Sequence, residues 1–261
     1  MNKMLETIKP IIDKFKIDGI TGMLIHGSYS RNENLPYSDV DLGIICESNQ
    51  IQSKLRNDEH YIYTFKDLLV EPKFYSFSDL KAAPLPVDYG EVEEKEIFWS
   101  EANRFNFEHS KIIYDPMNDI QKLFDEKVTY PESEKKLNIY YLTYEIELAL
   151  NYKLPRLIKA ERLIDSQAIM NSLIRDVVHL LYAKKQRFLP FDKDMSFWFK
   201  KGIFSNTKYL EALYENSAPK LKETNKRILS FWTFCENYKL SITKRSIIEE
   251  VENFGAKAFL V

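Results

Sequence analysis

The feature that most constrains the fold is a strand–turn–strand pattern between Met23 and Cys46. Apolar residues at 23–25 indicate a short buried strand, and residues 40–46 indicate a second one. Asp39 and Asp41 are two positions apart, so on an extended backbone both carboxylates point to the same face. Two adjacent negative charges need a cation between them, and Mg²⁺ is the usual cation for an all-oxygen pair. The pattern therefore predicts a metal site at the start of the second strand.

The turn between these strands carries groups that suit a phosphate. Gly27 and Ser28 offer backbone N–H groups and a hydroxyl, which can hold a phosphate oxygen. A phosphate-binding turn beside metal-binding carboxylates indicates phosphoryl-group chemistry.

These residues also carry a family resemblance. Gly27-Ser28, ten residues, and then Asp39-Val40-Asp41 resemble the signature of the DNA polymerase β-like nucleotidyltransferase superfamily. Arg31 and Pro36-Tyr37-Ser38-Asp39 stand at the spacing found in kanamycin nucleotidyltransferases and their antibiotic-modifying relatives. A further block at 70–76 resembles the strand that carries the next acidic residue of those enzymes, which is Glu71 here.

The resemblance implies a mixed-sheet α/β nucleotidyltransferase domain followed by an α-helical bundle. It also implies transfer of a nucleoside monophosphate, AMP from ATP, to a hydroxyl of a small molecule such as an aminoglycoside or lincosamide. Two Mg²⁺ ions would be held by Asp39, Asp41 and Glu71, with Asp67 as the alternative third acid. The triphosphate would be bound by four residues: Gly27, Ser28, Arg31 and Ser38.

In the related enzymes, the general base is a glutamate on the first long helix of the helical domain. Glu145 and Glu147 both fall in the corresponding segment. Glu145 stands among apolar residues, which would raise its pKa towards the working range, so we prefer it over Glu147. The lysine that follows the base by four residues in that family has no counterpart here, and the nearest one is Lys153. A catalytic role for neither glutamate stays open.

The first half of the chain reads as alternating helices and strands. The first 16 residues predict an amphipathic helix limited by Pro10, with these apolar residues at helical spacing: Met4, Leu5, Ile8, Ile11, Ile12 and Phe15. Further along we expect strands at 61–65, 68–75 and 107–114 and helices at 91–104 and 119–127. Pro72 cannot donate a ladder hydrogen bond, so it predicts an edge or a bulge in its strand.

A domain boundary is expected near residue 129, which separates a nucleotidyltransferase domain at 1–128 from a helical bundle at 129–261. Thr129 followed by Glu132 is typical of a capping box that starts a helix. Beyond it we expect four helices, at 137–152, 166–183, 219–238 and 243–253.

Four other features were weighed as functional groups. His26 and His179 are better explained as packing residues than as ligands. The aromatic run 197–199 is expected to pack the bundle, and Lys193 is an alternative ligand of the triphosphate.

Composition limits the partners. The 261-residue chain has 37 basic and 39 acidic residues and a formal net charge of −2, which argues against bulk nucleic acid as a partner. Cys46 and Cys235 lie outside any metal-ligand spacing and predict buried thiols in a reducing compartment. The sequence shows no signal-peptide pattern and no apolar run of membrane-spanning length, so we expect a cytoplasmic protein.

Two alternatives to the small-molecule enzyme stay open. One is a nucleotidyltransferase that acts on a protein or RNA end, and the other is a non-catalytic nucleotide-binding protein with the same fold. A homodimer is the assembly that the resemblance implies.

Overall fold

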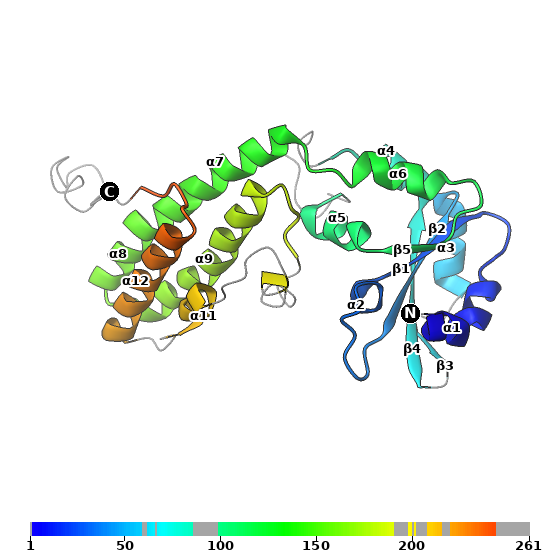
Figure 1. Cartoon of the computed structure of the whole chain (residues 1–261), viewed down its shortest axis with the longest axis horizontal. Coiled ribbons are helices and arrows are strands. Elements are labelled where there is room, and N and C mark those ends of the chain that lie inside the picture. The colour runs from blue at the N-terminus through cyan, green and yellow to red at the C-terminus, as the bar shows by residue number, and fades with distance from the viewer. Residues whose placement is uncertain are drawn as a thin grey trace. The chain divides into compact units, whose positions relative to one another are not determined.

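A computed structural model describes residues 2–58, 62–65, 67–85, 99–190, 198–199, 201, 208–215 and 220–243. The chain divides into two compact units, Met1–Thr129 and Tyr130–Val261 (Figure 1). Each unit has a hydrophobic core of its own.

The first unit is built on a five-stranded mixed sheet in the order β3-β4-β2-β1-β5. β2 and β4 run parallel, and the other neighbouring pairs run antiparallel. The strands are β1 (Ile20–His26), β2 (Val40–Cys46), β3 (Tyr63–Phe65), β4 (Leu68–Ser76) and β5 (Lys111–Tyr114). The predicted mixed-sheet fold is confirmed.

Helices cover both faces of this sheet, because alternate strand residues are apolar on each side. Met23 and Ile25 face a core that includes residues of α1 (Asn2–Lys14) and α3 (Asn49–Asp58). Leu24 faces a second core, which three other helices complete: α4 (Phe77–Ala82), α5 (Glu101–Glu108) and α6 (Asp119–Lys127).

Pro10 lies inside α1 and does not limit it, contrary to our expectation. Apolar side chains on both sides of Pro10, such as Ile8 and Ile12, are buried. Their burial holds the helix together across the backbone hydrogen bond that proline cannot donate.

Two expected boundaries are wrong. Residues 107 and 108 belong to α5 and not to a strand, because Ser100 caps this helix by accepting a hydrogen bond from the Asn103 N–H and Phe107 is buried in the second core. Thr129 does not cap the following helix; its hydroxyl donates to the Glu126 carbonyl, and Pro131 occupies the N-cap. Of the helix expected at 91–104, residues 91–98 lie outside the described residues, and residues 101–104 form the start of α5.

Among the described residues, Pro72 has a strand neighbour on one side only. β4 pairs with β3 only at residues 68–70, and beyond them it pairs with β2 among the described strands. Within that part of the chain, Pro72 thus lacks a ladder partner on one side, a position that suits a residue without a backbone N–H.

The second unit is helical. Its elements are α7 (Glu132–Leu148), the π-helical turn η3 (Ala149–Lys153), α8 (Leu154–Lys159), α9 (Leu163–Lys184), α11 (Lys208–Tyr214) and α12 (Leu221–Asn237). Phe199 is fully buried against Phe234 and Tyr238, in agreement with the packing role expected for this aromatic run. Phe197, Lys193 and the expected helix beyond residue 243 lie outside the described residues.

Both cysteines, Cys46 and Cys235, are buried free thiols whose pKa burial raises, to about 11 for Cys46 and about 12 for Cys235. Of the helices that the structure describes, none combines the length and apolar character needed to cross a membrane.

Candidate active site

Three predicted acids lie together on the neighbouring strands β2 and β4 and just before β2. Asp39, Asp41 and Glu71 each present a carboxylate oxygen, and these oxygens all lie within 4.8 Å of one another. Asp41 on β2 and Glu71 on β4 are register partners in a parallel pair, which sets them side by side. Asp67, the alternative third acid, is exposed in the turn before β4 and is not a member of this group.

Gly27 brings the predicted phosphate turn directly against Asp41. Its φ of +70° lies in the left-handed region, and a β-carbon at this position would stand 1.9 Å from Asp41 Oδ2. Only glycine fits both conditions. The turn itself forms the short helix α2 (Gly27–Ser30), where the Ser30 hydroxyl donates to the Gly27 carbonyl at 2.8 Å.

A side chain from α5 holds this turn in place. Asn106 Oδ1 accepts from the Gly27 N–H at 3.3 Å, and Asn106 Nδ2 donates to His26 Nδ1 at 3.0 Å. His26 is the register partner of Asp41 on β1, and its Nε2 lies 3.5 Å from the Tyr75 hydroxyl. Sequence reasoning missed Asn106, because nothing local marks a residue that acts 80 positions away.

His26 is neutral at physiological pH. It is 2% exposed, and burial lowers its pKa to about 4 despite the nearby charge of Asp41. A neutral imidazole can accept the hydrogen bond from Asn106 at Nδ1 and carry its proton on Nε2. His26 is therefore a packing and hydrogen-bonding residue, as expected.

Lys73 supplies a positive charge among the acids. Its ammonium group lies 2.7 Å from Asp41 Oδ1 and 3.7 Å from Glu71 Oε2. Burial alone would lower the pKa of Lys73, but the hydrogen bond and charge of Asp41, together with Glu71, raise it overall. The alternation that places Lys73 on the face of Glu71 was the available signal for this contact.

Residues 5–114, which include all five strands and the three acids, match the family described as "Nucleotidyltransferase domain". The first unit of the chain is thus similar to nucleotidyltransferase domains. The prediction of a nucleotidyltransferase of the polymerase β-like superfamily is thereby confirmed, while the match does not extend to the kanamycin enzymes in particular.

Two further comparisons add context. Residues 99–195 match a "Domain of unknown function (DUF4037)". A solved nucleotidyltransferase-like protein from Exiguobacterium sibiricum 255-15 is similar over 90% of this chain and 75% of that one, with 12% identity and a TM-score of 0.48. A comparison with curated proteins found no match.

Two predicted nucleotide ligands of the nucleotidyltransferase domain make other contacts in the structure. Arg31 is 8% exposed, and its Nε donates to Glu33 Oε2 at 2.8 Å. Ser38 Oγ accepts from the Leu35 N–H at 2.9 Å and so closes the turn that precedes Asp39. Their binding of a nucleotide stays a prediction.

The predicted base lies in the second unit and is joined to the nearest lysine. Glu145 Oε2 accepts from Lys153 Nζ at 3.1 Å. In an ideal α-helix, eight residues rotate by about 800°, which would leave Lys153 about 80° away from Glu145. The π-helical turn η3 holds more residues per turn than an α-helix and brings Lys153 back to the face of Glu145.

Glu147, the alternative base, has a structural contact instead. Its Oε1 accepts from the Thr243 N–H at 2.7 Å, while Asn151 Nδ2 donates to the Thr243 carbonyl at 2.9 Å. The two side chains together anchor the segment that follows α12. Both glutamates therefore have a partner in the structure, and the choice of Glu145 as the base stays a prediction.

Proposed function

We propose that this nucleotidyltransferase moves a nucleoside monophosphate, AMP from ATP, to a hydroxyl of a small molecule and releases pyrophosphate. The observation that carries the proposal is the meeting of Asp39, Asp41 and Glu71 within 4.8 Å at the turn of Gly27. Acids that close together repel one another unless a cation neutralises them, and a phosphate turn beside them fits a metal-bound triphosphate.

The donor set fits Mg²⁺. All three ligands are carboxylate oxygens, the type that this hard cation prefers, and Asp41 and Glu71 already attract the ammonium group of Lys73. Two bound Mg²⁺ ions would polarise the phosphoryl oxygens and favour ionisation of the acceptor hydroxyl. Asp39, Asp41 and Glu71 are the residues that would hold them.

The chain's own groups would divide the remaining work. Phosphate oxygens would be held by the Gly27 and Ser28 N–H groups and the Ser28 hydroxyl. Arg31 would exchange its ion pair with Glu33 for one with the departing pyrophosphate and would neutralise its charge. Glu145 would accept the proton of the acceptor hydroxyl.

The acceptor class is taken from the likeness of Arg31 and residues 36–39 to antibiotic-modifying enzymes. Aminoglycosides and lincosamides both carry free hydroxyls. They are therefore the first acceptors to test.

The experiment is pyrophosphate release from ATP and Mg²⁺ against a panel of these antibiotics. We expect release with one acceptor class and at least a ~10²-fold loss in the Asp39→Asn/Asp41→Asn variant, since preorganised electrostatic contacts are worth that much. Asp67→Asn removes an exposed carboxylate outside the metal group and is the matched control, which should keep parental release.

Two other outcomes would reject the acceptor class or the whole proposal. Mg²⁺-dependent ATP binding without release across the panel would reject the antibiotic acceptors and leave the nucleotide site standing. Absence of ATP binding, or equal release by the Asp39→Asn/Asp41→Asn variant, would refute the proposal.

A further inference from the structure

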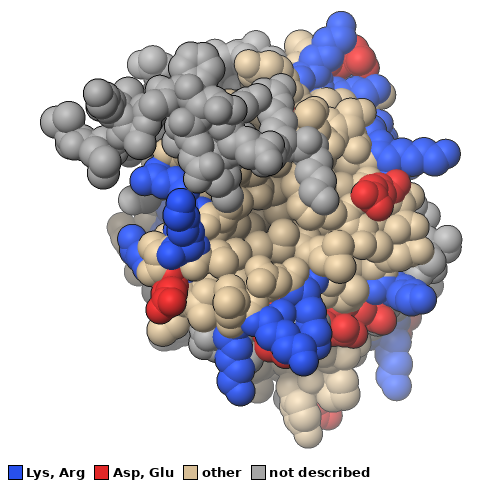
Figure 2. All heavy atoms as spheres, turned by 90° about the vertical axis from the view of Figure 1, so that its left-hand side faces the viewer, with Lys and Arg blue, Asp and Glu red and all other residues tan. Residues whose placement is uncertain are grey.

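A second charged site lies in the helical unit, around α8. Residues 153–162 contain four basic residues and one acidic residue, although the chain as a whole has a net charge of −2. On the face drawn in Figure 2, Lys and Arg side chains lie around a group of uncharged residues, with Asp and Glu side chains beside some of them. Such a local excess of positive charge attracts anions.

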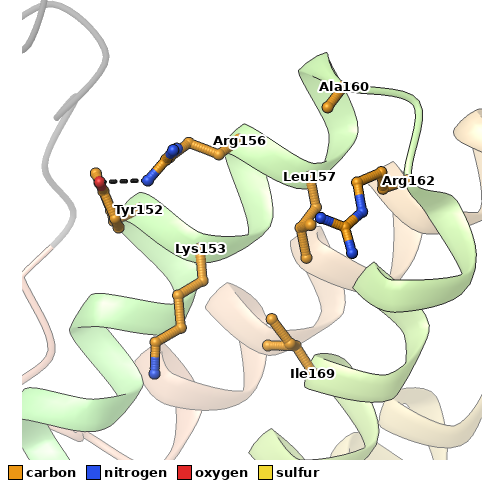
Figure 3. A pocket seen from close by; sticks show the side chains of 7 residues that line it. All are labelled: Tyr152, Lys153, Arg156, Leu157, Ala160, Arg162 and Ile169. Atoms are coloured by element: carbon orange, nitrogen blue, oxygen red, sulfur yellow. Dashed lines mark hydrogen bonds between the residues drawn. The ribbon is translucent and has the colours of Figure 1, made fainter. Parts of the chain in front are cut away.

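This segment lines a cavity that is open to the surface and has a volume of about 380 Å³. Lys153, Arg156 and Arg162 line it together with the apolar side chains of Leu157 and Ile169. The Arg162 guanidinium group lies beside Leu157, whereas that of Arg156 points toward Tyr152 (Figure 3). The cavity therefore offers both charge and an apolar contact surface.

Of the three cations that line the cavity, Arg156 is the one with no ion pair to a described residue. Its guanidinium group donates to the Tyr152 hydroxyl and stacks 4.9 Å from the centroid of that ring. Within the described part of the chain, no carboxylate forms an ion pair with it. Stacking holds the planar group in position while the N–H groups not used by Tyr152 stay available for a ligand.

The other two cations are partly neutralised. Lys153 pairs with Glu145 at 3.1 Å, and Arg162 pairs with Asp165 at 2.6 Å. The Arg162 side chain is 64% exposed, so its ion pair with Asp165 contributes little and can exchange for a stronger anion. These pairs leave a net positive charge at the cavity.

We propose that this cavity binds the phosphate group of a small phosphorylated organic compound. Arg156 and Arg162 would donate to the phosphate oxygens, since guanidinium groups match phosphate with paired hydrogen bonds. Leu157 and Ile169 would contact the carbon skeleton. The site is separate from the proposed transfer reaction and does not depend on it, although Lys153 contacts both the cavity and Glu145.

The test is isothermal titration of the full-length protein with phenyl phosphate, inorganic phosphate and benzoate, with EDTA present and ATP absent. We expect phenyl phosphate to bind tighter than the other two, because only it has both the phosphate and the apolar group. In the Arg156→Gln/Arg162→Gln variant its Kd should rise at least about tenfold, the scale of losing charge-assisted hydrogen bonds.

Two controls locate the binding. Lys222→Gln/Lys226→Gln removes two charges from exposed positions of α12 that do not line the cavity, and Ser28→Ala alters the phosphate turn of the first unit. Both should keep the parental Kd for phenyl phosphate within about twofold, less than the effect of one charge-assisted hydrogen bond. An unchanged Kd in the arginine variant, or an equal loss in either control, would overturn the proposal. Circular dichroism of each variant shows that the helices are retained.

Discussion

At the residue scale, the closest constraint in the proposed site is the contact between Gly27 and the Asp41 carboxylate. The left-handed backbone of Gly27 lets the turn pass directly beside the Asp41 carboxylate, where a β-carbon would overlap Oδ2. The proposed nucleotide site therefore requires glycine at position 27, because any side chain there would displace the Asp41 carboxylate. The metal acids and the phosphate turn are tied together through this one contact.

We expect Gly27→Ala to lower the free energy of unfolding by about 1–3 kcal/mol, since it adds positive-φ strain and overpacking. Pyrophosphate release should fall at least ~10²-fold, because Asp41 must leave its place beside Glu71. Urea unfolding and the release assay measure the two effects. Ser30→Ala is the control, as it removes one hydrogen bond in the same turn without touching Asp41; equal activity losses in both variants would contradict this account.

His26 predicts how stability depends on pH. Its pKa falls from 6.5 to about 4 on folding, so below pH 6.5 the unfolded chain binds a proton that the folded chain refuses. The free energy of unfolding should therefore decrease as pH falls from 6.5 to about 4, by about 3 kcal/mol from this group.

Urea unfolding of the parent and His26→Gln, in EDTA at about pH 7 and about pH 4, measures this effect. Gln can still meet Asn106 but does not titrate, so the variant should lose less stability between the two pH values. Identical losses in the two proteins would show that another group controls the acid response.

At the scale of elements, the π-helical turn and the strand register decide which charged groups meet. The parallel register of β2 and β4 sets Asp41 beside Glu71. In the helical unit, η3 rotates Lys153 onto the face of Glu145. Both arrangements depend on backbone geometry that extends over a whole element.

The two glutamates of α7 give a matched pair of variants. Glu145→Gln should lower kcat by about 10²–10⁴-fold with little change in ATP binding, the range for loss of a general base. Glu147→Gln should keep kcat and cost about 1 kcal/mol of stability, since it weakens the hydrogen bond from the Thr243 N–H. Rapid-quench kinetics and thermal unfolding separate the two; a larger kcat loss in Glu147→Gln would reverse the assignment.

At the scale of the whole molecule, the chain has two units with separate hydrophobic cores. In the second unit, a buried arginine also links three helices. The second unit contains Arg227, which is 1% exposed and donates to the Leu213 carbonyl at 2.8 Å, to Asn171 Oδ1 at 2.6 Å and to Gln167. Burial lowers its pKa, but its hydrogen bonds join α9, α11 and α12.

Arg227→Met should destabilise the second unit by about 3 kcal/mol, because it leaves two buried acceptors, the Leu213 carbonyl and Gln167 Oε1, without this donor. Gly27→Ala acts on the first unit. We expect scanning calorimetry to resolve two unfolding transitions. Gly27→Ala should shift the transition of the first unit, Arg227→Met that of the second, and the double variant should show both shifts, because the two sites share no core. A single transition shifted by either variant would show that the two units unfold together.

The strand–turn–strand segment, the shared face of Asp39 and Asp41 and the apolar face of α1 follow from sequence, because side-chain periodicity is a local property of the backbone. Their residues can be read in order without knowing what packs against them. Glu71 was the preferred third acid and Asp67 the alternative, and the tertiary structure sets Glu71 beside Asp41, since strand register is set by burial across the sheet. It also decided the contacts of Asn106 with Gly27 and of Lys153 with Glu145. Those contacts depend on how helices pack or turn, and no local pattern encodes them.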